Sequence, residues 1–195
     1  VLEVFKTKIE LTAFEFFSQA ALDKVIKRQG HSAPFATQAP FYALIEFETR
    51  TQVTSVALAL FEQCAAQGWV LDGVVSQSLA QTRALWRLRE DISETLWHWQ
   101  PYKNDISVRV SKMSDFLAEV DQLVAARYPD FEIVWYGHIG DGNLHLNILK
   151  PEDLPQTEFF ERCGIVSLEI GELLARYGGS ISAEHGVGLL KKSLL

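Results

Sequence analysis

The chain has 195 residues, of which 48% are hydrophobic and 22% charged, a composition typical of a globular fold. Its formal net charge of −7 is spread along the sequence without a block of lysine and arginine that could neutralise phosphates, so nucleic-acid binding is not expected. No apolar stretch approaches the roughly 20 residues that a membrane-spanning helix needs, so no transmembrane segment is predicted.

The first third of the sequence predicts strands that alternate with helices. Apolar patterning favours strands over three segments: 11–17, 41–48 and 69–76. A helix is predicted after the N-cap residue Ser18, through Ile26, and a second helix over 52–67. Gly, Pro, Ser and Thr dominate residues 30–40, which are therefore predicted to form a loop.

The same alternation returns after a long predicted helix over 78–99, whose apolar face carries Leu85, Leu88, Ile92 and Leu96. Three further strands are predicted: 105–110, 131–137 and 144–149. Two further helices are predicted: 114–128 and 156–177, the second ended by Gly178 and Gly179. No linker divides the chain. We expect one α+β domain over residues 1–195, with a mostly antiparallel sheet, helices packed on one face and two ferredoxin-like halves.

The two cysteines, Cys64 and Cys163, lie far apart in the sequence, each within an apolar helical pattern. Free cysteine is among the most buried residue types, and disulfides are rare in reducing compartments. The pattern therefore favours two buried free thiols over a disulfide.

A glycine-rich turn separates two histidines in the stretch 136–147. Gly140-Asp141-Gly142-Asn143 joins two strand-like segments and favours a tight turn, which would bring His138 and His145 together on paired strands. Cross-strand neighbours lie about 5 Å apart, close enough for two imidazoles to share a metal ion. The alternative is a glycine-rich hairpin with two unrelated histidines. Because two of only five histidines fall at the ends of one turn, we favour a site.

A carboxylate and a third histidine stand side by side in the glycine-rich stretch 178–188. Glu184 could complete a His/His/Glu set that leaves one metal position open for substrate. Adjacent side chains do not easily bind the same ion, so His185 would be available for acid–base chemistry near neutral pH. The alternative is a helix C-cap followed by a new helix.

Arg89 and Ser93 lie one helical turn apart and could present a guanidinium and a hydroxyl to a carboxylate. A solvated charged face explains the same pattern and is the more common case. Lys103, from its surroundings alone, is most simply a surface lysine.

These motifs together resemble one family. Residues 137–145, GHIGDGNLH, resemble the GHxGDGNxH motif of the C-terminal domain of FAD-linked oxidases, in the vanillyl-alcohol-oxidase-type flavoprotein superfamily. Residues 182–188 resemble its EHGxG motif, residues 85–90 its WxxRE helix, and residues 11–16 its opening strand. The motifs agree in order and spacing over nearly the whole chain. Members of this family include D-lactate dehydrogenases, the glycolate oxidase flavin subunit and D-2-hydroxyglutarate dehydrogenase.

The resemblance implies a role for each motif residue. His138, His145 and Glu184 would hold a divalent metal, expected to be zinc, that binds the hydroxyl and carboxylate oxygens of a 2-hydroxy acid. His185 would take the hydroxyl proton while a hydride passes to FAD. The residues expected to bind the substrate are Asn147 and, for a distal carboxylate, Arg89, Ser93 and Lys103. Ala183, where lactate and glycolate relatives often carry Gly, resembles the hydroxyglutarate subgroup.

The family's flavin-binding domain normally precedes this one, and nothing in the chain offers a flavin diphosphate-binding loop. FAD is therefore expected to be held mainly by a domain absent from this chain, and the fragment is not expected to turn over substrate alone. The sequence also stops soon after EHGVG, where relatives continue, and Arg109 stands where they often place proline. The family suggests a quinone, a cytochrome or an electron-transfer flavoprotein as electron acceptor. The expected location is the cytoplasm, or the mitochondrial matrix in a eukaryote.

Two readings from other functional classes stay open at this point. One is a stand-alone metal-binding or structural module, and the other is a scaffold subunit that has lost catalysis. The presence together of His138, His145, Glu184 and His185 argues against the scaffold, because an inactive site has no physical need for that set. A His/His/carboxylate set also suits iron, manganese or cobalt.

Overall fold

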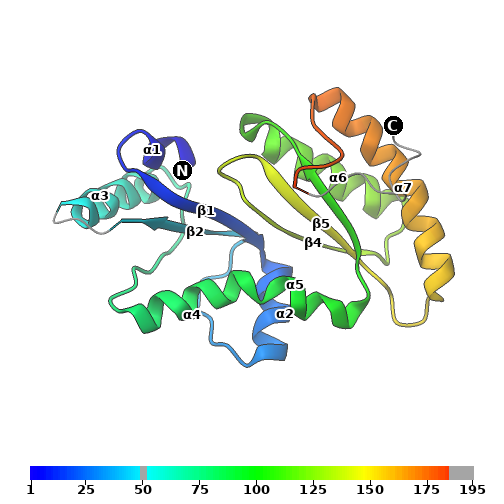
Figure 1. Ribbon diagram of the computed structural model, residues 1–195, viewed down its shortest axis with the longest axis horizontal. Helices are drawn as coiled ribbons and strands as arrows, with labels where there is room; N and C mark the ends of the chain where they lie inside the picture. The colour runs from blue at the N-terminus through cyan, green and yellow to red at the C-terminus, as the bar shows by residue number, and fades with distance from the viewer. Residues whose placement is uncertain (49–51, 185–195) are drawn as a thin grey trace. The chain divides into compact units, whose positions relative to one another are not determined.

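The computed structural model describes residues 1–48 and 52–184, and the chain divides into two compact units, Val1–Ile92 and Ser93–Leu195 (Figure 1). Within each unit the strands pair antiparallel: β1 (Leu11–Ser18) with β2 (Phe41–Phe47) in the first, and β5 (Asn143–Leu149) with both β3 (Tyr102–Ser107) and β4 (Glu132–Gly137) in the second. The expected α+β class with antiparallel pairing is confirmed.

The first unit builds two strands and four helices: α1 (Leu2–Lys6), β1 (Leu11–Ser18), α2 (Gln19–Gln29), β2 (Phe41–Phe47), α3 (Val53–Ala66) and α4 (Leu79–Glu90). The Ser18 hydroxyl accepts a hydrogen bond from the Ala21 amide, so the predicted N-cap of α2 is confirmed. One core cluster joins the α1 region to α3: Phe5, Ile9, Ala57, Leu60 and Cys64.

The described residues of the second unit follow the strand order of a ferredoxin-like fold without its last strand. Its elements are α5 (Ile92–Leu96), the 3-10 turn η1 (Trp97–Trp99), β3 (Tyr102–Ser107), the 3-10 turn η2 (Val110–Lys112), α6 (Met113–Arg127), β4 (Glu132–Gly137), β5 (Asn143–Leu149) and α7 (Gln156–Tyr177). The sheet order β4-β5-β3, with helices after β3 and β5, is a βαββα arrangement. Ser180 then makes an antiparallel bridge with Ser107, at the place where a fourth strand would pair.

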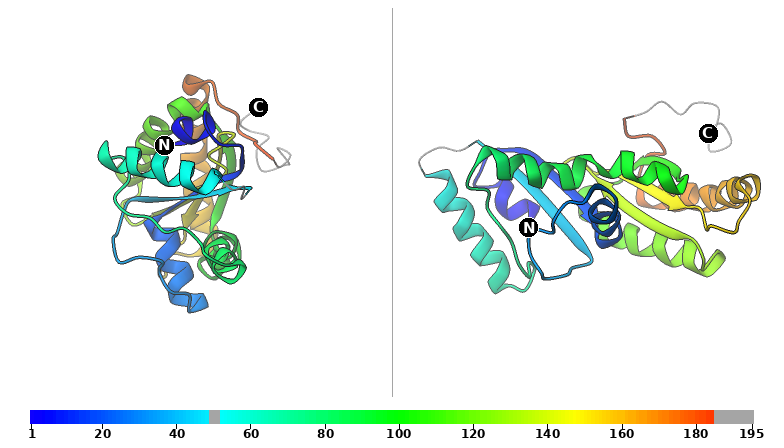
Figure 2. Two further views of the ribbon diagram at one scale, coloured as in Figure 1. Left: turned by 90° about the vertical axis from the view of Figure 1, so that its left-hand side faces the viewer. Right: turned by 90° about the horizontal axis from the view of Figure 1, so that it is seen from below.

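Side-chain alternation gives the sheet of the second unit two chemically different faces. One face is apolar: Trp135 and Leu146 are register partners, and the Trp135 indole donates a hydrogen bond to Asp121 of α6 at 2.8 Å. Helices α6 and α7 pack side by side over this face (Figure 2). Because successive strand residues point to opposite faces, the other face receives a polar set: Lys103, Asp105, Ser107, Asn143, His145 and Asn147.

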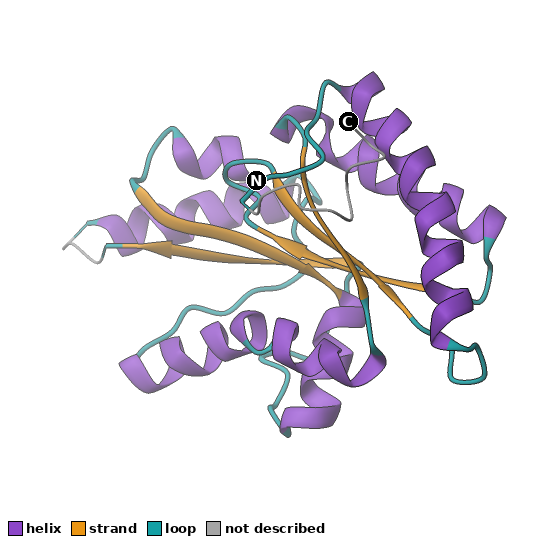
Figure 3. Cartoon of the chain, turned by 45° about the vertical axis from the view of Figure 1, so that its right-hand side comes forward, coloured by secondary structure: helices purple, strands orange, loops and turns teal. Residues whose placement is uncertain are grey.

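The strand predicted over 69–76 is wrong, because these residues form a loop between α3 and α4 (Figure 1, Figure 3). Gly68 ends the preceding helix with a φ of +70°, and Asp72 turns the chain locally by accepting a hydrogen bond from the Gly73 amide. Leu71 stays 67% exposed, so the apolar alternation here reflects no sheet face. A short apolar run predicts a strand only ambiguously, because a strand is stable only where it pairs with a neighbouring strand.

Two other boundaries differ from the sequence prediction. The helix predicted over 78–99 ends at Glu90, and the chain continues as the separate short elements α5 and η1. Strand β3 begins at Tyr102 and ends at Ser107, whereas residues 105–110 were predicted, because Val110 already starts a 3-10 turn. The short helix α1 was not predicted at all.

Both cysteines are free and fully buried, as predicted. Burial raises the pKa of the Cys163 thiol to about 12 by penalising its thiolate form. A thiol that stays protonated is a poor nucleophile, so Cys163 acts as a packing residue of α7.

Candidate metal centre

The β4–β5 hairpin brings the two histidines together as the sequence predicted. The His138 carbonyl accepts hydrogen bonds from the Asp141 and Asn143 amides, and Gly142 turns the chain with a φ of +87°. Tyr136 and His145 are register partners on the paired strands. The two imidazole rings lie with their centroids 5.5 Å apart, nearly perpendicular to each other.

Glu184 reaches the same place from the segment that follows α7. Gly178 ends that helix with a φ of +63°, and two backbone hydrogen bonds between Ser107 and Ser180, at 3.0 and 2.8 Å, hold the segment beside β3. The Glu184 carboxylate then lies 3.4 Å from Nε2 of His138. Residues separated by 46 positions in the sequence are therefore adjacent because α7 returns the chain to the edge of the sheet.

His138, His145 and Glu184 can each offer one ligand atom, and these atoms lie within 4.8 Å of one another. Neighbouring ligands of a tetrahedral zinc ion stand about 3.4 Å apart, given bonds of about 2.0–2.1 Å. Small side-chain rotations would be enough to close the cluster around such an ion. Two imidazoles and one carboxylate are also the donor set of catalytic zinc sites, which keep a position for substrate. The residues therefore fit a divalent metal.

Asp105 adjoins this cluster, although no motif in the sequence singled it out. Its side chain is buried, and it is the register partner of His145 across β3 and β5. Its Oδ1 lies 3.6 Å from Nδ1 of His145, and its Oδ2 accepts hydrogen bonds from the Glu184 amide at 2.8 Å and the Ala183 amide at 3.3 Å. An acidic residue opposite a candidate ligand on a paired strand is the signal that could have identified it.

Asn147 and Lys103 continue the polar face beyond His145, and they are register partners. The Asn147 side chain is almost fully buried, and its amide nitrogen donates to the His145 carbonyl at 3.2 Å. The Lys103 ammonium donates to the Ser93 hydroxyl at 3.3 Å and lies 4.9 Å from the centre of the Trp97 ring. Partial burial lowers the pKa of the Lys103 amine. The structure thus brings three of the four predicted substrate residues, Asn147, Lys103 and Ser93, into one unit.

Arg89, the fourth of these residues, has a partner in the first unit. Its guanidinium lies 2.9 Å from the Glu15 carboxylate of β1, and the two side chains are 9% and 8% exposed. A buried guanidinium beside a carboxylate ties α4 to β1. Its predicted role in gripping a substrate carboxylate stays a prediction.

Replacing Arg89 with methionine is expected to lower the free energy of unfolding by about 3–5 kcal/mol, because it leaves the Glu15 carboxylate buried beside an apolar side chain. The double variant Glu15→Leu with Arg89→Met removes both charges and should recover a large part of that loss. Urea unfolding of the two variants measures the difference. A single variant within 1 kcal/mol of wild type, on the scale of exposed pairs, would contradict a tie between α4 and β1.

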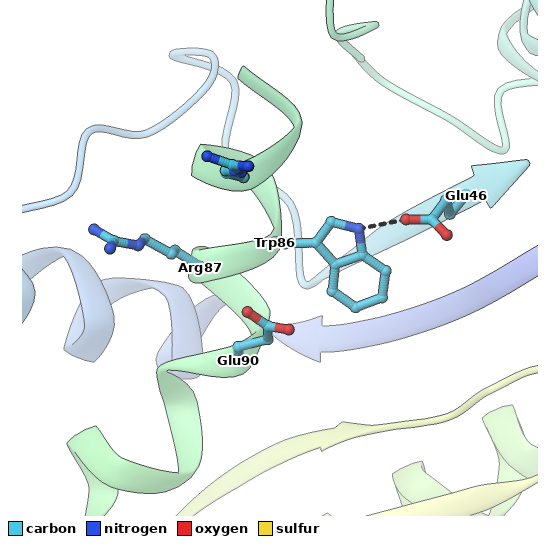
Figure 4. Close-up of a pocket in the computed structure, with 5 residues that line it drawn as sticks. Glu46, Trp86, Arg87 and Glu90 are labelled. Carbon is cyan, nitrogen blue, oxygen red and sulfur yellow. Dashed lines mark hydrogen bonds between the residues drawn. The ribbon is translucent and has the colours of Figure 1, made fainter. Parts of the chain in front are cut away.

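The Trp86 side chain, also from the WxxRE-like stretch, links α4 to β2. Its indole nitrogen donates to the Glu46 carboxylate at 2.7 Å (Figure 4). The Thr12 hydroxyl donates to the same carboxylate at 2.8 Å. A hollow of about 430 Å³ opens here, lined by Glu46, Arg83, Trp86, Arg87 and Glu90. Its two carboxylates and two guanidiniums balance, so the lining carries no net formal charge that would favour an ionic ligand of one sign. Trp86 and Arg89 together hold α4 against the β1–β2 pair.

His185, the predicted acid–base residue, lies outside the described residues.

No helix in the part of the chain that the structure describes is long and apolar enough to cross a membrane.

The comparisons with known proteins agree with these motifs. A family model described as FAD linked oxidases, C-terminal domain, matches residues 1–195. The chain is 59% identical to a D-2-hydroxyglutarate dehydrogenase of Stutzerimonas stutzeri and 51% identical to one of Xanthomonas citri pv. viticola, in both cases over 100% of its own length. It is also 34% identical, over 95% of its length, to a mitochondrial D-2-hydroxyglutarate dehydrogenase of Danio rerio. The chain spans 42%, 41% and 34% of these curated relatives, respectively.

Proposed function

The chain belongs to the family of FAD linked oxidases, C-terminal domain, and from this membership we propose that it is the substrate-binding part of a dehydrogenase. The enzyme would oxidise a D-2-hydroxy acid to the 2-oxo acid, with FAD, held mainly by a separate flavin-binding domain, as hydride acceptor. The observation that carries the proposal is the convergence of His138, His145 and Glu184 from three segments of the chain onto one point. Such a set has no role in packing, since two of its members are substantially exposed.

These three residues would hold a divalent metal, with zinc as the first choice for two imidazoles and a carboxylate. When bound, the metal supplies Lewis-acid polarisation of the substrate oxygens and lowers the pKa of the hydroxyl. His185 directly follows the carboxylate ligand in sequence and would take the hydroxyl proton. Transfer of that proton, with departure of the hydride from C2, leaves the 2-oxo acid.

The remaining polar residues would orient the substrate. Asn147 follows His145 on the same face of β5, and its amide would hydrogen-bond a substrate oxygen beside the metal. Lys103 lies opposite Asn147 on β3, on the row of the polar face next to the row of His145 and Asp105, and its ammonium donates a hydrogen bond to Ser93. This order along the sheet, from metal ligands to a cation, suits a substrate with a second carboxylate at its far end.

We therefore propose D-2-hydroxyglutarate as the substrate, ahead of lactate or glycolate. A cation on the row of the polar face next to that of His145 supports a dicarboxylate, and the names of the relatives support the same choice. Arg89 stays a predicted further contact for that carboxylate.

The substrate proposal predicts a selective effect of Lys103→Met in the full-length enzyme. Losing a charge-assisted hydrogen bond worth about 1.5–3 kcal/mol should lower kcat/KM for D-2-hydroxyglutarate by roughly 10–150-fold. Oxidation of D-lactate, which lacks the second carboxylate, should change by less than about threefold. The measurement is steady-state reduction of an artificial electron acceptor with each substrate.

Lys112→Met is the matched control, because Lys112 is an exposed lysine of the same unit at the end of η2. It should leave both rates unchanged. Equal losses for D-2-hydroxyglutarate and D-lactate in Lys103→Met would contradict a distal-carboxylate role. A flavin-loaded wild-type enzyme that binds metal but oxidises no 2-hydroxy acid would overturn the dehydrogenase proposal in favour of a structural metal-binding module.

A further inference from the structure

Asp105 contacts two parts of the candidate metal site through its two carboxylate oxygens: the backbone that carries Glu184 and the ring of His145. Oδ2 accepts hydrogen bonds from the backbone amides of Ala183 and Glu184, and Oδ1 faces Nδ1 of His145 at 3.6 Å. The side chain is only 9% exposed. A carboxylate that is buried at this point therefore contacts the segment that carries one ligand and the ring of another.

We propose that Asp105 is a positioning residue that fixes the His145 tautomer and anchors the Glu184 backbone, so that the metal ligands are arranged before metal arrives. This inference rests on the proposed metal site. Histidine ligands commonly donate their second ring N–H to a carboxylate, which orients the ring and sets which nitrogen binds metal. Here Asp105 would accept the proton of Nδ1 and leave Nε2 of His145 for the ion.

The distances agree with such a role. At 3.6 Å the contact with His145 is just longer than a hydrogen bond, and a slight ring rotation toward the other ligands would bring Nδ1 into range. The Glu184 amide, at 2.8 Å, is already within hydrogen-bond distance. Because that amide belongs to the ligand residue itself, the hydrogen bond restrains the position of the Glu184 backbone and therefore the positions that its carboxylate can reach.

The variant Asp105→Asn separates the two functions of the carboxylate. Its carbonyl oxygen can replace Oδ2 and keep the two backbone hydrogen bonds, whereas its NH2 group would replace Oδ1 and present donors to Nδ1 of His145. Nδ1 would then have to accept, which places the ring proton on Nε2, the nitrogen needed by the metal. Asp105→Ala removes both functions.

The test is zinc affinity of the full-length protein, measured by competition with a chromophoric chelator, together with the thermal midpoint of the zinc-free protein. Asp105→Asn is expected to weaken zinc binding about 10–100-fold while its thermal midpoint stays near that of wild type. Asp105→Ala should weaken zinc binding at least as much and also lower the midpoint. Nitrogen chemical shifts of His145 should report the exchanged tautomer in Asp105→Asn.

Asp121→Asn is the matched control, because Asp121 is a carboxylate of the same unit that accepts a hydrogen bond from Trp135 rather than from the cluster. It should leave zinc affinity unchanged. Zinc affinity of Asp105→Asn within threefold of wild type, while His145→Ala loses zinc, would overturn the role of Asp105 and leave the metal site standing. Failure of the wild-type protein to bind zinc would overturn both.

Discussion

Replacing His145 with alanine is expected to weaken zinc binding by more than about 100-fold and to abolish the proposed oxidation of D-2-hydroxyglutarate. Loss of an outer-shell partner already costs roughly 10–100-fold in metal affinity, and loss of a direct ligand should cost more. His145 is half-buried between Tyr136, with ring centroids 4.8 Å apart, and Asp105. A water molecule could take the ligand position of the missing nitrogen, but it would not be held there before the metal binds, as the imidazole is. Elemental analysis of the purified full-length variant measures the bound metal.

His98→Ala provides the control for this experiment. His98 lies in the same unit on η1, where its exposed ring contacts Trp99 edge-on, and it has no place in the cluster. One metal per chain should remain bound in His98→Ala and be absent in His138→Ala, His145→Ala and Glu184→Gln. Full metal retention in His145→Ala would rule out the proposed ligand set, whatever the activity of the variant.

Two of the three cluster residues could be placed together from the sequence, because His138 and His145 lie in one hairpin. Gly140-Asp141-Gly142-Asn143 favours a turn locally, and period-2 alternation then decides which side chains share a face. Those two rules are enough to bring His138 and His145 together. Glu184 was a candidate from its own glycine-rich stretch, but its place beside the two histidines could not be predicted locally, because it requires the whole length of α7 and the bridge between Ser107 and Ser180.

The residues that sequence reasoning missed depend on pairing between distant segments. Asp105 is significant only because β3 lies beside β5 in a register that places it opposite His145. Arg89 was interpreted from the helix face it shares with Ser93, but its ion-pair partner, Glu15, comes from a strand more than 70 positions earlier. The strand predicted over 69–76 failed for a related reason, since an apolar alternation forms a strand only where a partner accepts its hydrogen bonds.

The turn that presents the histidines is itself constrained, and Gly142→Ala is expected to lower the free energy of unfolding of this unit by about 3 kcal/mol or more. Gly142 has a φ of +87°, a region that costs an L-residue roughly 1–2 kcal/mol. A Cβ here would also stand 2.2 Å from the backbone oxygen of Val108, so the strand end or the turn must move. Because the Val108 amide donates to the Gly142 carbonyl, that movement would break a backbone hydrogen bond.

Gly178→Ala is the control that separates the destabilisation caused by a steric clash from that caused by the backbone conformation. Gly178 has a φ of +63° in the same unit, and a Cβ there would meet nothing within 4 Å, so only the conformational cost of about 1 kcal/mol is expected. Urea unfolding compares the two variants, and zinc affinity shows whether the damage reaches the cluster. Equal destabilisation by both would mean that the contact with Val108 relaxes without cost. A larger loss in Gly142→Ala, accompanied by weaker zinc binding, would mean that close packing of the turn against the end of β3 holds His138 and His145 in place.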